Sequence, residues 1–437
     1  DQLVAIGSLA GDAITGATDS VAVGYGALSA MTTGYGCVAI GPTALALSTG
    51  NNNIAIGSRA GDALSTTSDV VLIGTDAGGA INSTGAHYTV AIGGSALAAL
   101  TSGSGNVAVG HQSLDANVTG QYNVAIGYQA MTTETDADKC IAIGYQALYT
   151  QNYSSGGAIS NIAIGSGAGY EITTGTDNVM IGTNAMANIG QASGANNVAI
   201  GTAAMKGAAG SVASNDAQHN VAVGFNALTV ITTGDNNVAV GSLAGDAITT
   251  GSSNVMIGTA AGTAAVDVDA TVIIGNNAAG ANMTADADGT VLIGSSAGAA
   301  ITGGRYNTAV GFNALLTEVI GDQNTAIGYE ALKDQTGVNG AVNNTAVGFK
   351  AGTDVTSGHN NTFIGSQAGY AATTVDYCVG VGALACGNVT VEGAGNADGT
   401  VGIGKTAAGG VTTGIGNTAV GYEALKVDDD GDFNTAI

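Results

Sequence analysis

Residues 234–258 read GDNNVAVGSLAGDAITTGSSNVMIG, and this stretch decides the fold. Its phrases NVAVG and NVMIG end at Gly241 and Gly258, which lie seventeen positions apart. The same phrase recurs along the whole chain of 437 residues, and its last residue is called the closing glycine below. Self-similarity at a fixed period is the signature of a repeat architecture, so the sequence predicts a stack of similar coils.

The spacing of the closing glycines indicates the minimum size of one coil. The phrase has 24 copies, and 15 of the 23 steps between closing glycines have the same length of seventeen positions. One step is shorter by a single position, and the other seven are longer by two to six. Because insertions in repeat proteins are accommodated in loops, a coil of about 17 residues is the geometric minimum.

The residues before each closing glycine predict a β-strand. In all 24 copies the residue three before it is Val, Ile or Thr, and the residue one before it is Ile or Val. The residue between these two is Ala in 16 copies. Alternation with period two and β-branched side chains are typical of a strand. We expect the β-branched face to form the core and the Ala face to contact a neighbouring copy of the chain.

The rest of the coil is equally regular. The third residue after the closing glycine is Ala in 23 copies, and the fourth is commonly either Leu or Gly. Except for Met180, whose copy has Met186 as its fourth residue, bulky residues two before the closing glycine occur in copies whose fourth residue is Gly or Ala, which predicts that the two positions touch. These bulky residues are Leu72, Met256, Ile273, Leu292 and Phe363. Asn often follows thirteen residues after the closing glycine, and we expect its side chains to form hydrogen bonds along the stack.

These patterns together predict an all-β fold, a parallel β-solenoid or β-roll of about 24 coils, with two short strands per coil of about 17 residues. We expect residues 1–437 to form a single continuous solenoid without a separate catalytic domain. The chain opens at DQLVAIG and stops at FNTAI, so we expect it to be truncated within a repeat at both ends. One coil buries few large side chains, which favours further burial between chains and therefore a homo-oligomer.

Composition and charge exclude several partners. The chain has 73 Gly, one Pro and 9% charged residues, and its formal net charge is -24. Nucleic acids and anionic lipid surfaces require a basic footprint, so neither is an expected partner. No stretch provides the roughly 20 apolar residues of a membrane-spanning helix. We therefore expect no membrane insertion.

No constellation of residues predicts an enzyme, a cofactor or a catalytic site. Cys37, Cys140 and Cys378 replace the recurrent Asn, and a bridge from Cys378 to Cys386 is the one disulfide worth considering, with unpaired thiols as the alternative. The four histidines occupy different registers of the repeat and are not expected to converge on a zinc or catalytic site. They are His87, His111, His219 and His359.

Asp-rich insertions are the only plausible metal sites, since carboxylates around a Gly turn suit Ca²⁺. They lack a complete calcium-binding motif, so solvated loops are the main interpretation. The residues concerned are Asp267, Asp269, Asp286, Asp288, Asp428, Asp429, Asp430 and Asp432. Aromatic residues also follow closing glycines in consecutive coils, as at Tyr128 and Tyr145. Such a ladder is interpreted as corner packing, with binding of sugar rings as the alternative.

The phrases NVAIGYQAL, NTAIGYEAL and TTGxxNTAVG resemble the repeats of phage tail-fibre proteins, which often end in a self-cleaving chaperone domain of the endosialidase type. They are also similar to the NSVAIG phrases in the left-handed β-roll heads of YadA-like trimeric autotransporter adhesins. The resemblance covers essentially the whole chain. It implies a left-handed, homotrimeric, extracellular fibre on a virion or on a bacterial cell surface.

Three classes of function follow from these expectations. The first is the shaft of a phage tail fibre that positions a tip for attachment to a host receptor or glycan. The second is a bacterial cell-surface adhesin or self-assembling extracellular filament. The third is an ice-binding solenoid, although the threonines come as pairs at corners and do not alternate along a strand face. A polysaccharide-degrading solenoid is disfavoured because no carboxylate pair recurs on a strand face.

Overall fold

The structure of the chain is a computed structural model that describes residues 2–83, 85–153, 157–189, 194–208, 216–337, 340–389, 397–427 and 430–437. The chain is an all-β parallel β-solenoid of about 24 turns with about 17 residues per turn. The described residues contain no α-helix, and a short 3-10 helix, η1, spans Ala285–Ala287. The predicted fold class is therefore confirmed. The chain divides into two compact units, unit 1 (Asp1–Asn220) and unit 2 (Val221–Ile437).

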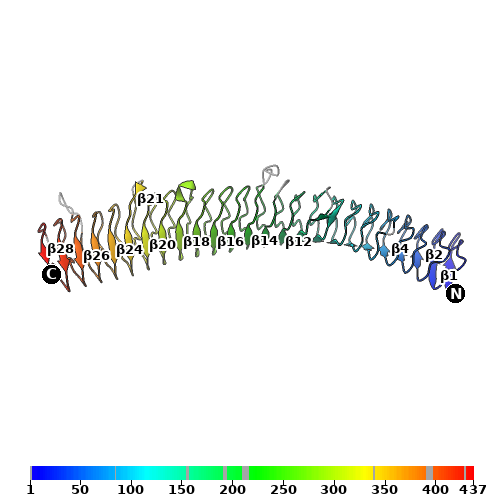
Figure 1. Ribbon diagram of the computed structural model, residues 1–437, viewed down its shortest axis with the longest axis horizontal. Coiled ribbons are helices and arrows are strands. Elements are labelled where there is room, and N and C mark those ends of the chain that lie inside the picture. The colour runs from blue at the N-terminus through cyan, green and yellow to red at the C-terminus, as the bar shows by residue number, and fades with distance from the viewer. Residues whose placement is uncertain are drawn as a thin grey trace. The chain divides into compact units, whose positions relative to one another are not determined.

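In unit 1 one short strand of each coil joins a parallel sheet, and Figure 1 shows these strands following one another along one side of the coils. The partners align without any shift, so that Val124, Ala125 and Ile126 lie beside Ile141, Ala142 and Ile143. The strands are β1 (Leu3–Ile6), β2 (Ser20–Val23), β3 (Val38–Ile40), β4 (Ile54–Ile56), β5 (Val71–Ile73), β6 (Val90–Ile92), β7 (Val107–Val109), β8 (Val124–Ile126), β10 (Ile141–Ile143), β12 (Ile162–Ile164), β13 (Val179–Ile181) and β14 (Val198–Ile200).

Unit 2 repeats the same arrangement, with Val238, Ala239 and Val240 beside Val255, Met256 and Ile257. Its strands are β15 (Val221–Val223), β16 (Val238–Val240), β17 (Val255–Ile257), β18 (Val272–Ile274), β19 (Val291–Ile293), β20 (Thr308–Val310), β22 (Thr325–Ile327), β24 (Thr345–Val347), β25 (Thr362–Ile364), β26 (Val379–Val381), β27 (Val401–Ile403), β28 (Thr418–Val420) and β29 (Thr435–Ala436). The strand predicted before each closing glycine is thus present in both units.

The second strand expected in each coil forms at only two places among the described residues. In unit 1, β9 (Ala137–Asp138) pairs with β11 (Gly157–Ala158), and in unit 2, β21 (Gly321–Asp322) pairs with β23 (Gly340–Ala341). Elsewhere left-handed residues bend the backbone, as at Leu243 with a φ of 58° and Ser253 with a φ of 62°. A strand requires negative φ, so these residues keep the rest of the coil irregular.

The closing glycines are required by both backbone conformation and space. Gly258 has a φ of 134°, and a Cβ built on it would lie 2.6 Å from the carbonyl oxygen of Gly275 in the next coil. The same relation recurs from one coil to the next within each unit. A side chain at this position would strain the backbone and collide with the neighbouring coil. This double constraint explains why the glycine is invariant among the repeats.

The expected assignment of the two strand faces is wrong, because the middle residue of each strand, which is most often Ala, points inward. From β2 to β28, the middle residue of each main-sheet strand is buried and its two β-branched neighbours are partly exposed. The coil is narrow at this level, since a Cβ built on Gly402 would lie only 2.6 Å from the carbonyl oxygen of Ala407. One side chain per strand points into this space, and it is Ala in 16 copies. The bulky middle residues, such as Leu72 and Phe363, are accommodated where the fourth residue after the closing glycine is Gly or Ala.

The predicted contact between the middle strand residue and the fourth residue after the closing glycine is confirmed. A Cβ built on Gly78 would lie 2.8 Å from Leu72 Cδ2, and one on Gly298 would lie 2.6 Å from Leu292 Cδ2. Where the strand carries Ala, the fourth residue is often a fully buried Leu, such as Leu228. The two positions therefore share one volume in the interior of the coil.

Candidate association surface

The outward face of each main sheet consists of two columns of β-branched side chains. We call the residue three before a closing glycine the first outward position, the residue one before it the second outward position, and the two columns together the Val/Ile face. At the second outward position every residue is partly exposed, and the most open ones inside the sheet reach about two fifths, as in Ile126 (37%), Ile257 (38%) and Ile403 (42%). Each unit thus presents a regular apolar stripe to solvent.

No charged residue occupies the Val/Ile face in any of the 24 copies of the phrase, although the chain carries a formal net charge of -24. The ionic contacts of the described residues lie elsewhere on the coil. Arg59 pairs with Asp76 at 2.5 Å, and both follow their closing glycines by two residues. Confinement of the charges to the rest of the coil leaves this face uncharged along each unit.

A buried amide ladder holds each strand in register beneath this face. The Nδ2 group of Asn254 donates to Asn237 Oδ1 at 2.9 Å and to the Val268 carbonyl at 2.7 Å. The Asn254 backbone N–H also donates to Asn237 Oδ1, at 3.0 Å. The predicted hydrogen bonding of Asn side chains along the stack is therefore confirmed. The ladder fixes the axial alignment of consecutive coils and hence the regular spacing of the outward side chains.

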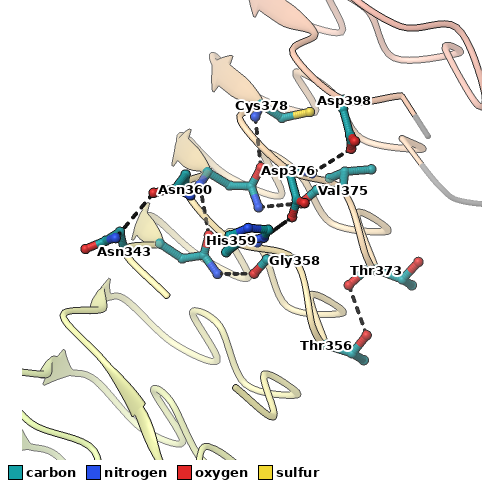
Figure 2. Close-up of polar contacts among 12 residues, drawn as sticks. Asn343, Thr356, Gly358, His359, Asn360, Thr373, Val375, Asp376, Cys378 and Asp398 are labelled. Carbon is teal, nitrogen blue, oxygen red and sulfur yellow. Dashed lines mark hydrogen bonds and ion pairs between the residues drawn. The ribbon is translucent and has the colours of Figure 1, made fainter. Parts of the chain in front are cut away.

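The cysteines in the ladder are structural substitutions, as the sequence predicted. The Cys378 backbone N–H donates to Asn361 Oδ1 at 2.9 Å, and in Figure 2 its side chain lies within the coil. All four cysteines are free and buried, so the disulfide considered between Cys378 and Cys386 is not formed. Burial raises the pKa of Cys378 to about 12 and that of Cys140 to about 11. Such thiols are poor nucleophiles and metal ligands at neutral pH.

Two buried carboxylates were missed by the sequence analysis. Glu134 and Glu318 lie seven residues after their closing glycines, where most coils carry an apolar residue. Glu318 accepts hydrogen bonds of 2.7 to 3.1 Å from the backbone N–H groups of Val319, Ile320, Gly321 and Gly337 and from Gln335 Nε2. Glu134 similarly accepts bonds from the Ala137 backbone N–H and Gln151 Nε2. The sequence did contain a signal for these carboxylates. A Gln lies seven residues after the next closing glycine, Gln151 for Glu134 and Gln335 for Glu318.

We expect the substitution Glu318→Gln to destabilise unit 2 by about 2 kcal/mol. The amide NH₂ would face backbone N–H donors that the carboxylate now satisfies, leaving some of these buried donors without an acceptor. Chemical denaturation followed by circular dichroism measures the loss. Glu134→Gln should have a similar effect in unit 1, whereas Glu423, whose side chain is 36% exposed and pairs with Lys426 at the surface, is the control. Equal stability of Glu318→Gln and Glu423→Gln would contradict the role of the buried carboxylate.

The Asp-rich segments provide side-chain acceptors for backbone groups in neighbouring coils. Asp269 Oδ1 accepts a hydrogen bond from the Ser252 backbone N–H at 2.6 Å, and Asp288 Oδ1 accepts one from the Asp269 backbone N–H at 2.8 Å. Asp286 pairs with Arg305 at 3.2 Å. Asp432 Oδ1 accepts a bond from the Ile415 backbone N–H at 3.0 Å, and Asp430 is exposed.

These segments do not assemble into a calcium site within the described part of the chain. Asp428 and Asp429 lie outside the described residues. Among the described residues, no group of three or more His, Cys, Asp or Glu side chains could hold a metal ion. We therefore assign Asp269, Asp288 and Asp432 a structural role in the hydrogen bonding between coils.

Asp288 gives the stability of unit 2 a dependence on pH. Burial and the nearby charges of Asp269 and Asp267 raise its pKa above the usual 3.8. The Asp288 carboxyl group therefore binds a proton more readily in the folded state than in the unfolded state. The ionised carboxylate destabilises the folded state at pH 7, and this loss of stability is absent below about pH 4, where the carboxyl group is protonated. We expect Asp288→Asn to raise the Tm at pH 7 but not at pH 3.5. A gain of equal size at both pH values in thermal melts would contradict this assignment.

The histidines and aromatic residues are distributed along the coils and do not form a common site. His359 Nδ1 contacts Asp376 Oδ1 (Figure 2), and His87 Nδ1 lies 3.1 Å from the Ser68 backbone nitrogen. Tyr128 and Tyr145 are stacked with ring centroids 5.6 Å apart and planes 7° apart. Because each ring turns a face toward its neighbour, the stack favours corner packing over the binding of sugar rings.

No family model matches the chain, and no curated protein matches its sequence. Within the described ranges, no helix is long and apolar enough to span a membrane.

Proposed function

We propose that the chain is a non-enzymatic structural protein, the shaft of an extracellular phage tail fibre, in which three copies pack their Val/Ile faces around a common axis. In this role the solenoid positions a separate tip that attaches to a receptor or glycan on the host. The observation that carries the proposal is the charge-free stripe of partly exposed Val and Ile side chains on each unit.

The size of the stripe supports association. Over the strands of one unit, the outward side chains expose on the order of 1,000 Å² of apolar surface. A typical stable interface buries about 800 Å² per partner, and exposed apolar patches of more than a few hundred Å² commonly mark interaction sites. The Val/Ile face of either unit is large enough to support a stable interface.

The periodicity of the stripe favours another copy of the same chain as its occupant. Successive outward side chains are spaced by one coil, about 4.8 Å. A second copy carries ridges and grooves with the same spacing and can interdigitate along the whole face, whereas an unrelated globular surface cannot. The number of copies, three, rests on the resemblance to tail-fibre repeats and to adhesin heads.

Immunogold electron microscopy tests the location of the protein. Antibodies against the purified chain should label the tail fibres of virions from the source, and preincubation with the purified chain should abolish the label. Labelling of bacterial surfaces without virions would replace the tail-fibre proposal with the cell-surface adhesin or filament. Labelling confined to the interior of cells would contradict an extracellular fibre.

A further inference from the structure

The Val/Ile face of unit 1 contains little information that could align two copies along the axis. From β2 to β14 both outward positions of every main-sheet strand are Val or Ile. If one such face slides along another by one coil, apolar side chains meet apolar side chains again. A purely periodic interface therefore tolerates slippage, as flat and uniform strand surfaces do in general.

Unit 2 differs because Thr replaces Val or Ile at the first outward position of several strands. Four consecutive strands of its main sheet, β20, β22, β24 and β25, begin with Thr, as do β28 and β29. The residues are Thr308, Thr325, Thr345, Thr362, Thr418 and Thr435. The first five are partly exposed and the last is exposed, so their hydroxyl groups lie on the face that we assign to the partner copies.

These hydroxyl groups have no hydrogen-bond partner among the described residues of the chain, in contrast to many threonines at the corners. Thr232, for example, lies at a corner, and its Oγ1 donates to the Thr249 carbonyl at 3.0 Å. In an apolar interface a hydroxyl opposite a Val methyl loses its water without replacement, which is unfavourable. A hydroxyl opposite the Thr of another copy can form a hydrogen bond with it.

The order of these strands makes the alignment specific. In register, all six Thr strands of one copy meet Thr strands of the next. A shift by one coil leaves four of the six matched, and a shift by two to six coils leaves only two. The block of four strands and the separate pair thus penalise each of these displacements, in the way that a buried polar residue sets the register of a coiled coil.

We propose that the Thr pattern of unit 2 sets the axial register between copies of the chain. The inference rests on the proposed packing of Val/Ile faces and identifies the residues that determine its specificity. The uniform face of unit 1 contributes affinity, and the Thr strands of unit 2 select the alignment of the copies.

Disulfide trapping in the full-length chain tests this proposal. Val240 and Ile274 occupy the second outward position of strands two coils apart, a separation of about 10 Å that a disulfide cannot bridge. One chain carries Val240→Cys and a size tag, and the other carries Ile274→Cys. After coexpression and mild oxidation, gel electrophoresis distinguishes pairs of like chains from mixed pairs. The native chain, whose four cysteines are buried, is the background control.

The decisive comparison uses chains in which all six Thr are replaced by Val, a substitution of similar volume that suits a strand. The matched control also changes six residues of the same column but keeps the Thr pattern. The control substitutions are Val221→Ile, Val238→Ile, Val255→Ile, Val272→Ile, Val291→Ile and Val379→Ile.

We expect Val240→Cys chains to pair with one another in all backgrounds, and mixed pairs to rise at least about tenfold when Thr is replaced by Val, but not in the Val→Ile control. Equal amounts of mixed pairs with and without the Thr pattern would overturn the proposal. Absence of any trapped pair in assembled chains would show instead that the Val/Ile face is not the interface, and would overturn the proposed packing as well.

Discussion

The substitution Gly258→Ala is expected to destabilise unit 2 by about 3 kcal/mol or more. Two effects add, because Ala would adopt a φ of 134° and its Cβ would lie 2.6 Å from a backbone carbonyl oxygen of the next coil. Backbone strain and overpacking each cost about 1 to 3 kcal/mol. The collision cannot be relieved by rotation of a side chain, because the obstructing atom is the backbone carbonyl oxygen of Gly275.

Gly303→Ala in the same unit provides the control. Its backbone is outside the left-handed region, and the nearest atoms to a Cβ there would be Asp286 Cβ at 3.5 Å and Ile320 Cγ2 at 3.7 Å. We expect this variant to be as stable as the native chain in urea denaturation followed by circular dichroism. Similar losses for Gly258→Ala and Gly303→Ala would show that the stacked closing glycines are not the constraint that we infer.

Lysines on the Val/Ile face are expected to abolish association at micromolar concentrations. In a trimer each ammonium group would be buried against apolar side chains and close to its counterparts in the other copies, and neither desolvation nor repulsion would be compensated. The test variant carries Val240→Lys, Ile257→Lys, Ile327→Lys and Ile364→Lys, all at exposed second outward positions. Light scattering should report a single chain.

The matched control adds the same four positive charges at exposed positions away from the face. Its substitutions are Thr233→Lys, Thr250→Lys, Thr284→Lys and Ser357→Lys. This variant should retain the mass of the native assembly, and a comparison of the two separates the effect of the face from that of net charge. If the variant with four lysines on the Val/Ile face retained the assembled mass, this face would be excluded as the interface.

The sequence determined the coil but left the orientation of its strand open. In Val238, Ala239 and Val240 the period of two defines two faces, and the usual preference for larger apolar side chains in the core selects the wrong one. The space inside so short a coil decides the matter, and this space depends on how the opposite wall folds. The volume compensation between Leu72 and Gly78 contained the answer, because a residue that touches the buried fourth position must itself point inward.

Other features depend on contacts that no local pattern encodes. The Asn ladder was predictable because Asn recurs at a fixed position with the spacing of one coil. Glu318 occurs at a position that is apolar in most coils, and its role depends on backbone N–H groups that a local bend turns toward it. The Thr strands of unit 2 fit the strand pattern as well as Val does, so their significance follows only once the outward direction of that column is known.

The mass of the native, full-length assembly in solution tests the central claim most directly. Light scattering coupled to size exclusion gives this mass without reference to shape. We expect three times the chain mass of 41.8 kDa at physiological salt concentration, where the repulsion between copies of net charge -24 is screened. A stable, folded species with the mass of one chain would contradict the proposed fibre shaft and the assignment of the Val/Ile face as its interface.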